Sequence, residues 1–329
     1  MKTISIIFLV AVTSTSLALD ITPVTPPVQH AEGPHWDPVD QVLYYVDTFQ
    51  ATILRWDPKT ELFTSHKLQD RKSIGVITPI KDTAEQYIVA ADRLVYYFQW
   101  DGFHNDTGIA TELFEVEPQK PNNQFNDGKA DANGNMWIGT LTRNDDLGVT
   151  SFGGSLYRIE ISLDYHDEIE AKENQTSISN GIAWSSDNKF MFFIDSALKK
   201  VFKFDFDGDS VISNERVLFD LADHSELSGI PDGMTIDTDE NLWVALFGGS
   251  AIIQVHPVTG DLLQVVPMPV QFVTSLCFGG GELEILYATT SRLHLNEEGV
   301  QQQPSAGSVL SIEGLGVKGR PDFEVVLNN

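Results

Sequence analysis

Short runs of apolar residues recur along this chain and are separated by polar turns. Val42–Val46, Met136–Gly139 and Leu242–Ala245 are three such runs. A second run follows each closely, as Ala51–Trp56 follows the first, and Asp-Pro, Asp-Gly or Thr-Gly pairs close many of them. Runs of this length bounded by turn residues predict β-strands. No window shows a long helical period, so the sequence predicts an all-β fold.

The strand-like runs belong to a longer repeat. Each unit begins with a residue pair that ends in glycine or, once, serine, and the second positions recur every 42 to 53 residues. Repeats of roughly 40–50 residues are typical of solenoids, propellers or arrays. About four short strands per unit predict a six-bladed β-propeller with a central channel. The pairs that begin the units are Glu32-Gly33, Ile74-Gly75, Asp127-Gly128, Asn180-Gly181, Asp232-Gly233 and Thr274-Ser275.

The paired residues are interpreted as tight turns that enter the innermost strand of each blade. Those turns would open onto one end of the channel, while Ile74 and Thr274 would wall the pocket. The alternative is that they are only turn residues, because Asp, Asn and Gly favour turns in any protein. On the first interpretation one mouth of the channel gathers the following polar residues: Glu32, Asn126 or Asp127, Asn180 and Asp232.

Glu32, Asn180 and Asp232 offer two carboxylates and one amide oxygen. An all-oxygen set suits Ca²⁺, Mg²⁺ or Mn²⁺ better than a metal that prefers thiolates. Three protein ligands would leave positions open for a substrate, and such a metal can polarise a carbonyl. No G-x-S-x-G or H-E-x-x-H motif is present, so the familiar serine-nucleophile and zinc-protease signatures are missing.

The first residues have the pattern of a secretory signal peptide. Lys2 precedes the apolar run Ile4–Val12, and Ser16-Leu17-Ala18 is a small-x-small end. This run is too short for a membrane span, which needs about twenty apolar residues. We therefore expect residues 1–18 to be a signal peptide, residues 19–329 to form a single propeller domain, and the mature protein to be secreted.

Charge and composition limit the classes of binding partner that we expect. The net charge is −26, from 47 acidic and 21 basic residues, which argues against nucleic acid and anionic membranes as partners. The single cysteine, Cys277, lies in a strand-like run and is expected to be a buried, inert thiol. The sequons at Asn105 and Asn174 are candidate glycosylation sites in a secreted chain. We expect a monomer or a weak dimer that takes a small molecule.

Four motifs stand out along the chain: Glu32–Trp36, Phe125–Asp131, Ser179–Trp184 and Ile230–Met234. Cys277–Gly280 and Gly314–Gly319 near the end add to them. With these motifs the chain resembles the SMP-30/gluconolactonase/luciferin-regenerating family, and its regucalcin members in particular, over about residues 28–320 with colinear spacing.

The resemblance implies a six-bladed propeller with one divalent cation at the channel mouth. By resemblance, Glu32, Asn180 and Asp232 bind that cation, Asp232 also acts as catalytic acid or base, and Asn126 contacts substrate. Hydrolysis of sugar lactones such as gluconolactone is the implied activity. Ca²⁺ is our first expectation for the cation, with Zn²⁺, Mn²⁺ and Mg²⁺ as alternatives.

Two positions depart from the family pattern. Gln124 stands where an arginine is common, and Asn144 stands where we expect an acidic residue that binds sugar hydroxyls. Both amides can still bind a neutral ligand, more weakly than charge-assisted contacts do. The leading hypothesis is a metal-dependent hydrolase of a lactone or related ester. The alternatives are a secreted, non-catalytic calcium-binding or ligand-carrying propeller and, third, a hydrolase of phosphotriesters.

Overall fold

The computed structural model describes residues 19–145, 147–163 and 168–328. β-Strands dominate these residues, so the predicted all-β class is confirmed. No helix in these ranges combines the length and the apolar character needed to span a bilayer. The predicted signal peptide, residues 1–18, lies outside the described residues. The helical segments are η1 (Thr48–Gln50), η2 (Ser196–Leu198), η3 (Leu221–Asp223) and α1 (Glu297–Gln302).

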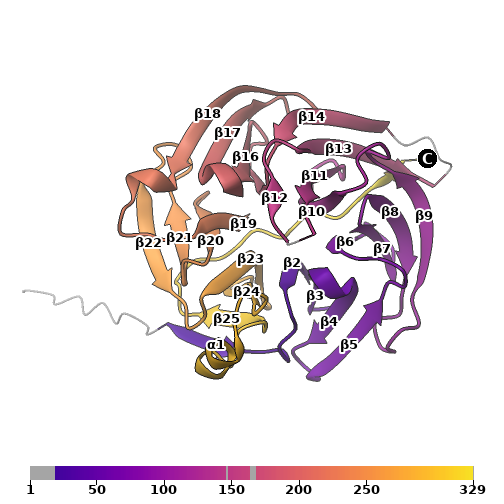
Figure 1. Cartoon of the computed structure of the whole chain (residues 1–329), viewed down its shortest axis with the longest axis horizontal. Coiled ribbons are helices and arrows are strands. Elements are labelled where there is room, and N and C mark those ends of the chain that lie inside the picture. The colour runs from indigo at the N-terminus through magenta and orange to yellow at the C-terminus, as the bar shows by residue number, and fades with distance from the viewer. Residues whose placement is uncertain (1–18, 146, 164–167, 329) are drawn as a thin grey trace, which may run out of the picture.

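Within the described ranges, three of the sheets are four-stranded and antiparallel, each built from consecutive strands. Figure 1 shows these sheets standing around a common axis, with the first strand of each nearest the centre. The strands are β2 (Ala31–Asp37), β3 (Val42–Asp47), β4 (Thr52–Asp57) and β5 (Leu62–Lys67); β6 (Ile74–Pro79), β7 (Gln86–Ala91), β8 (Leu94–Gln99) and β9 (Ile109–Glu115); and β15 (Ser179–Trp184), β16 (Phe190–Asp195), β17 (Lys200–Phe206) and β18 (Ile212–Asp220).

The other two sheets contain the same four-stranded unit with additions. In one, β12 joins the edge of β11, and β26 pairs in parallel with β13. In the other, two four-stranded groups are joined by the single residue pair Phe247 and Phe272. The first sheet contains β10 (Asn123–Ala130), β11 (Met136–Arg143), β12 (Val149–Thr150), β13 (Gly154–Ser162), β14 (Glu168–Thr176) and β26 (Leu327–Asn328). The second contains β19 (Ile230–Ile236), β20 (Leu242–Phe247), β21 (Ala251–Val255) and β22 (Leu262–Pro267), followed by β23 (Phe272–Gly279), β24 (Ile285–Ser291), β25 (Leu310–Glu313) and β1 (Asp20–Pro23).

The two ends of the chain meet in the last group. β1 pairs antiparallel with β25, from Asp20 opposite Glu313 to Pro23 opposite Leu310. The strands nearest the axis also close a ring, because each contacts the next in the order β2, β6, β10, β15, β19 and β23, and β23 contacts β2. A closed ring leaves no unpaired group of strands at which the assembly could open.

The residue pairs that begin the repeats are not turns, and that expectation was wrong. Each lies inside an innermost strand, where the pairing register with the second strand shifts, as between Glu32 and His35 or between Pro231 and Met234. Such a β-bulge re-aims the side chain beside it. Gly33 adopts a left-handed φ of 53° at its bulge. At Gly75 a Cβ would lie 2.1 Å from the main-chain oxygen of Asn126, so the close approach of neighbouring innermost strands excludes a side chain there.

The apolar core fills the space between neighbouring groups of strands. One cluster joins Val46 and Ile53 of the first sheet to Val89 and Phe98 of the second. Burial of such side chains stabilises each interface by roughly 2 kcal/mol per residue. Cys277 is fully buried and unpaired, as predicted, and burial raises the pKa of its thiol well above the usual value.

The C-terminal segment crosses the end of the ring at which the innermost strands finish. It bridges Gly319 to Asp237, Phe323 to Ala130 and Val325 to Ile80 before β26 joins β13. Figure 1 shows this segment as a yellow trace running across the centre of the ring. The segment therefore covers one end of the ring, and the starts of the innermost strands surround the other end.

Candidate metal and substrate site

A cavity of about 100 Å³ opens at the uncovered end of the ring. Glu32, Asn126, Asn180 and Asp232 all line it, and they come from four different innermost strands: β2, β10, β15 and β19. Residues up to 200 positions apart in the chain thus meet at one point, as the repeat predicted. The structure brings together the three predicted cation ligands and the predicted substrate contact Asn126.

The two amide side chains are held by hydrogen bonds to neighbouring strands. Nδ2 of Asn126 donates to the main-chain oxygen of Ser179 at 2.9 Å and to Oδ1 of Asn180 at 3.3 Å. Nδ2 of Asn180 donates to Oγ of Ser196 at 2.7 Å. Because these bonds use the NH₂ groups, the amide oxygens are the atoms left for a ligand.

The carboxyl groups of the site are crowded and largely buried. Burial raises the pKa of Glu32 well above its usual value, and the charges of Asp232 and Asp127 raise it further. Burial and the charge of Asp127 likewise raise the pKa of Asp232, against a hydrogen bond with Asn180 and the charge of Arg143. Three acids that repel one another in a poorly solvated place need a proton or a cation to offset their charge.

These observations fit a bound divalent cation. Among the described residues, no group of three His, Cys, Asp or Glu side chains is arranged to hold a metal by itself. A cation here would therefore also draw on the amide oxygen of Asn180, together with Glu32 and Asp232. That donor set contains only oxygen and suits a hard cation such as Ca²⁺.

The acid cluster predicts that stability depends on pH in the cation-free protein. Burial raises the pKa of Asp127 to about 6 from an ordinary 3.8. The folded protein therefore holds this proton more tightly than the unfolded chain does. The resulting stabilisation is complete below about pH 4 and is lost as the pH rises through about 6, with a size of roughly 3 kcal/mol. Urea unfolding of chelated protein across that range measures the effect. In Asp127→Asn this loss of stability between about pH 4 and 6 should be absent. If the free energy of unfolding changed equally with pH in the two proteins, the prediction would be wrong.

Besides the apolar residues of its wall, three polar cavity residues were missed by the sequence reading: Arg143, His30 and His294. Arg143 ends β11 and lies over the ring of Phe49, with its guanidinium carbon 5.2 Å from the ring centroid. His30 accepts or donates one hydrogen bond with Oγ of Ser291 at 2.8 Å, and its Nε2 lies 4.0 Å from Glu32. Side chains two residues apart along an extended strand lie on the same face. The prediction that Glu32 faces the cavity could therefore have indicated that His30 faces it too.

Gln124 and Asn144 do not line this cavity. Gln124 lies in β10 opposite Leu141, and its Nε2 is buried without a hydrogen-bond partner among the described residues. Asn144 is exposed in the turn after β11, where its Oδ1 accepts a hydrogen bond from Thr150. Arg143, the neighbour of Asn144, occupies the cavity wall instead. A substrate contact by Gln124 or Asn144 stays a prediction.

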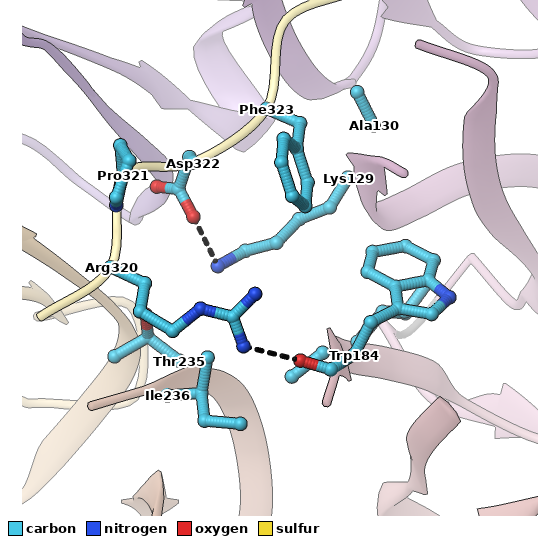
Figure 2. A pocket seen from close by; sticks show the side chains of 11 residues that line it. Lys129, Ala130, Trp184, Thr235, Ile236, Arg320, Pro321, Asp322 and Phe323 are labelled. Atoms are coloured by element: carbon cyan, nitrogen blue, oxygen red, sulfur yellow. Dashed lines mark hydrogen bonds and ion pairs between the residues drawn. The ribbon is translucent and has the colours of Figure 1, made fainter. Parts of the chain in front are cut away.

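Charged side chains lie at the end of the ring that the C-terminal segment covers. Figure 2 shows Nζ of Lys129 paired with Asp322 at 2.9 Å, and Arg320 donating to the main-chain oxygen of Trp184 at 3.0 Å. Burial disfavours the charge of Lys129, but the adjacent Asp322 holds its pKa above the usual value. The cavity beside them is only about 30 Å³, so the candidate site is the wider mouth at the opposite end.

Comparison with known proteins places this geometry in a family. A family profile described as "SMP-30/Gluconolactonase/LRE-like region" matches residues 30–292. Regucalcin of Xenopus laevis is 36% identical over 297 residues, which are 88% of this chain and 92% of that protein. Regucalcin of Danio rerio is 33% identical over 293 residues, covering 89% of this chain and 93% of its own.

A solved structure of luciferin-regenerating enzyme superposes with a TM-score of 0.85 at 36% identity, covering 94% of this chain and 100% of that one. A calcium-binding regucalcin of Agrobacterium tumefaciens shares the fold, with a TM-score of 0.82 at 22% identity over 94% of this chain and 98% of its own. The repeat, the ring of strands and these matches agree. The chain belongs to the SMP-30/gluconolactonase/LRE-like family.

Proposed function

We propose that the protein is a divalent-cation-dependent hydrolase of a lactone or related ester. The observation that carries the proposal is the convergence of Glu32, Asn180 and Asp232, with Asn126 beside them, in one cavity at the channel mouth. Membership of a family that includes gluconolactonases supports it. Hydrolysis adds water across the acyl C–O bond: the acyl carbon gains OH and the ring oxygen gains a proton.

The proposed frame for this site is a six-bladed propeller. Treating the two groups of the eight-stranded sheet as separate blades gives a blade for each strand of the innermost ring. The site lies near the axis, where four of those strands begin. Because each strand holds one residue of the site, a small shift of one blade would leave the other residues in place. A polar site of this kind needs side chains that are held in fixed positions.

Glu32, Asn180 and Asp232 are proposed to hold the cation, with Ca²⁺ as the first candidate. The oxygen-only donor set and the calcium-binding relative from Agrobacterium support that choice; Zn²⁺, Mn²⁺ and Mg²⁺ are the alternatives. When bound, a divalent cation supplies Lewis-acid polarisation of the substrate carbonyl.

The chain's own side chains have distinct proposed roles. Asp232 is proposed to take or return the proton that hydrolysis moves, because its carboxyl group lies in the cavity beside the proposed substrate contact Asn126. Asn126 orients the substrate through its amide oxygen, since Nδ2 is already bonded to Ser179. Gln124 and Asn144, which lie outside the cavity lining, stay proposed substrate contacts through their side-chain amides.

Removal and return of the cation tests the proposal. Chelated protein should not hydrolyse δ-gluconolactone or simpler lactones, and added Ca²⁺, Mn²⁺, Mg²⁺ or Zn²⁺ should restore turnover. A cation at about 100 times its dissociation constant should also stabilise the fold by about 2.7 kcal/mol. Cation binding that stabilises the fold without turnover of any lactone, ester or phosphotriester would instead establish the non-catalytic binding protein. Full turnover after complete chelation would overturn the cation dependence.

We also propose that the mature chain is secreted and glycosylated. Asn105, in the loop before β9, and Asn174, in β14, are both exposed, as sequon use requires. The strong negative charge supports a small-molecule ligand over nucleic acid or membrane, and a monomer or weak dimer is proposed.

A further inference from the structure

Much of the wall of the candidate cavity is apolar. Five separate segments contribute a hydrocarbon side chain, and each of these is only partly buried, so each leaves some of its surface open. Contact of a ligand with such a wall is favourable in proportion to the apolar area that leaves water. The five residues are Phe49, Ile178, Ile230, Phe247 and Leu293.

Aromatic contacts fix part of this wall. The ring centroid of Phe247 lies 4.8 Å from that of Phe272 and 6.1 Å from that of His30. The ring centroids of His30 and Phe49 are 5.1 Å apart. A rim of rings packed against one another leaves little freedom to repack around a strongly hydrated ligand.

Apart from the proposed cation ligands, four polar side chains line the cavity: Asn126, Arg143, His30 and His294. Glu32, Asn180 and Asp232 are assigned to the cation in the proposed function. The NH₂ group of Asn126 is bonded to Ser179. Arg143 gives Nη1 to the main-chain oxygen of Leu147 at 3.1 Å and stacks on Phe49.

A polyhydroxylated ring would therefore place hydroxyls against hydrocarbon. Each hydroxyl buried without a partner costs free energy. The amide oxygen of Asn126 and the remaining guanidinium donors of Arg143 can serve a carbonyl or one polar substituent. Even with the imidazoles of His30 and His294, the four hydroxyl-bearing positions of gluconolactone would need every remaining polar side chain at once, while hydrocarbon lines the rest of the wall.

We propose that the substrate is a small lactone or ester with a largely apolar body, an alkyl chain or an aromatic ring, and not a polyhydroxylated sugar lactone. This inference rests on the hydrolase function proposed above. The apolar body contacts Phe49, Phe247 and Leu293, and Arg143 supplies the single cationic contact.

Comparison of lactones by kcat/KM in cation-loaded protein tests the inference. From δ-valerolactone to its 6-propyl and 6-butyl derivatives, kcat/KM should rise by up to about fourfold per added methylene until the wall is filled. δ-Gluconolactone should fall at least about tenfold below δ-valerolactone. Equal or higher kcat/KM for δ-gluconolactone would overturn the proposal.

A matched pair of variants ties the preference to the wall. Leu293→Asn exchanges a partly buried hydrocarbon for an amide of similar size, and should reduce the ratio of kcat/KM for the 6-butyl lactone to kcat/KM for δ-valerolactone by about tenfold. Val258→Asn makes the same kind of exchange at a site that is 73% exposed in the β21–β22 turn, and should leave this ratio unchanged. An unchanged alkyl preference in folded Leu293→Asn would contradict the assigned wall.

Ligand binding separates failure of this inference from failure of the hydrolase proposal. Lactams of the same rings are not hydrolysed, so calorimetry with 6-butyl-δ-valerolactam and with gluconolactam measures the preference without turnover. Tighter binding of the alkyl lactam, with no lactone hydrolysed, would support the ligand class and reject the hydrolase. Rapid turnover of δ-gluconolactone with tighter binding of gluconolactam would support the hydrolase and reject the ligand class.

Discussion

Asp232→Asn is expected to lower lactone kcat/KM by about a thousandfold or more. The asparagine keeps the size of the side chain but removes both the charge that would hold a cation and the group proposed to move the proton. Asp232 is 7% exposed, it interacts with the charges of Asp127 and Glu32, and it is hydrogen-bonded to Asn180. Steady-state kinetics in saturating Ca²⁺ and calorimetric titration of Ca²⁺ would measure the two losses separately.

The stability of the same variant distinguishes lost function from lost folding. Without a cation, the Asp232 carboxylate is repelled by Asp127 and poorly solvated, so the neutral amide should unfold at the same or a higher urea concentration. Functional sites commonly hold such charge at a cost in stability. Turnover within tenfold of the original protein would reject Asp232 as the catalytic group, and a folded variant with unchanged Ca²⁺ affinity would reject it as a ligand.

Asp237→Ala is expected to destabilise the fold by about 4 kcal/mol, the largest structural effect we predict. Asp237 is fully buried where β19 ends. Its carboxylate accepts hydrogen bonds from the indole of Trp243 and from Nε2 of Gln254, both at 2.9 Å, and from the main-chain nitrogen of Asn241 at 2.8 Å. Alanine would leave these buried donors without an acceptor. Urea unfolding followed by tryptophan fluorescence measures the loss.

Asp239→Ala is the matched control, because this exposed residue lies in the same turn and should change stability by less than about 0.5 kcal/mol. Asp131, between β10 and β11, makes the same kind of hydrogen bonds. Its carboxylate accepts from the indole of Trp137 at 2.8 Å and from the main-chain nitrogen of Asn135. Asp131→Ala should therefore cost about as much as Asp237→Ala. A loss below about 1 kcal/mol at both sites would show that these bonds are not what holds the turns.

Local pattern was sufficient for much of the fold. The run Val42–Val46 lies in β3 and Leu242–Ala245 lies in β20, because strands buried on both faces need little beyond apolar, β-favouring residues. The repeat interval located the innermost strands and therefore the meeting of Glu32 with Asp232. The same pattern misread Asp232-Gly233 as a turn, since a β-bulge and a turn use similar residues and differ only in how the partner strand pairs.

By itself, the sequence determined the all-β class, the repeat, the acid or amide beside four of the bulge glycines, and the family, since all of these are written in local residue order. Only the tertiary structure decided which side chains share the cavity. Arg143, the last residue of β11, lines it, whereas Asn144 in the turn that follows is exposed. The closure of β1 on β25 and the Lys129–Asp322 pair join residues far apart in the chain. Contacts of that kind depend on how whole sheets pack around the axis, which no short stretch of sequence records.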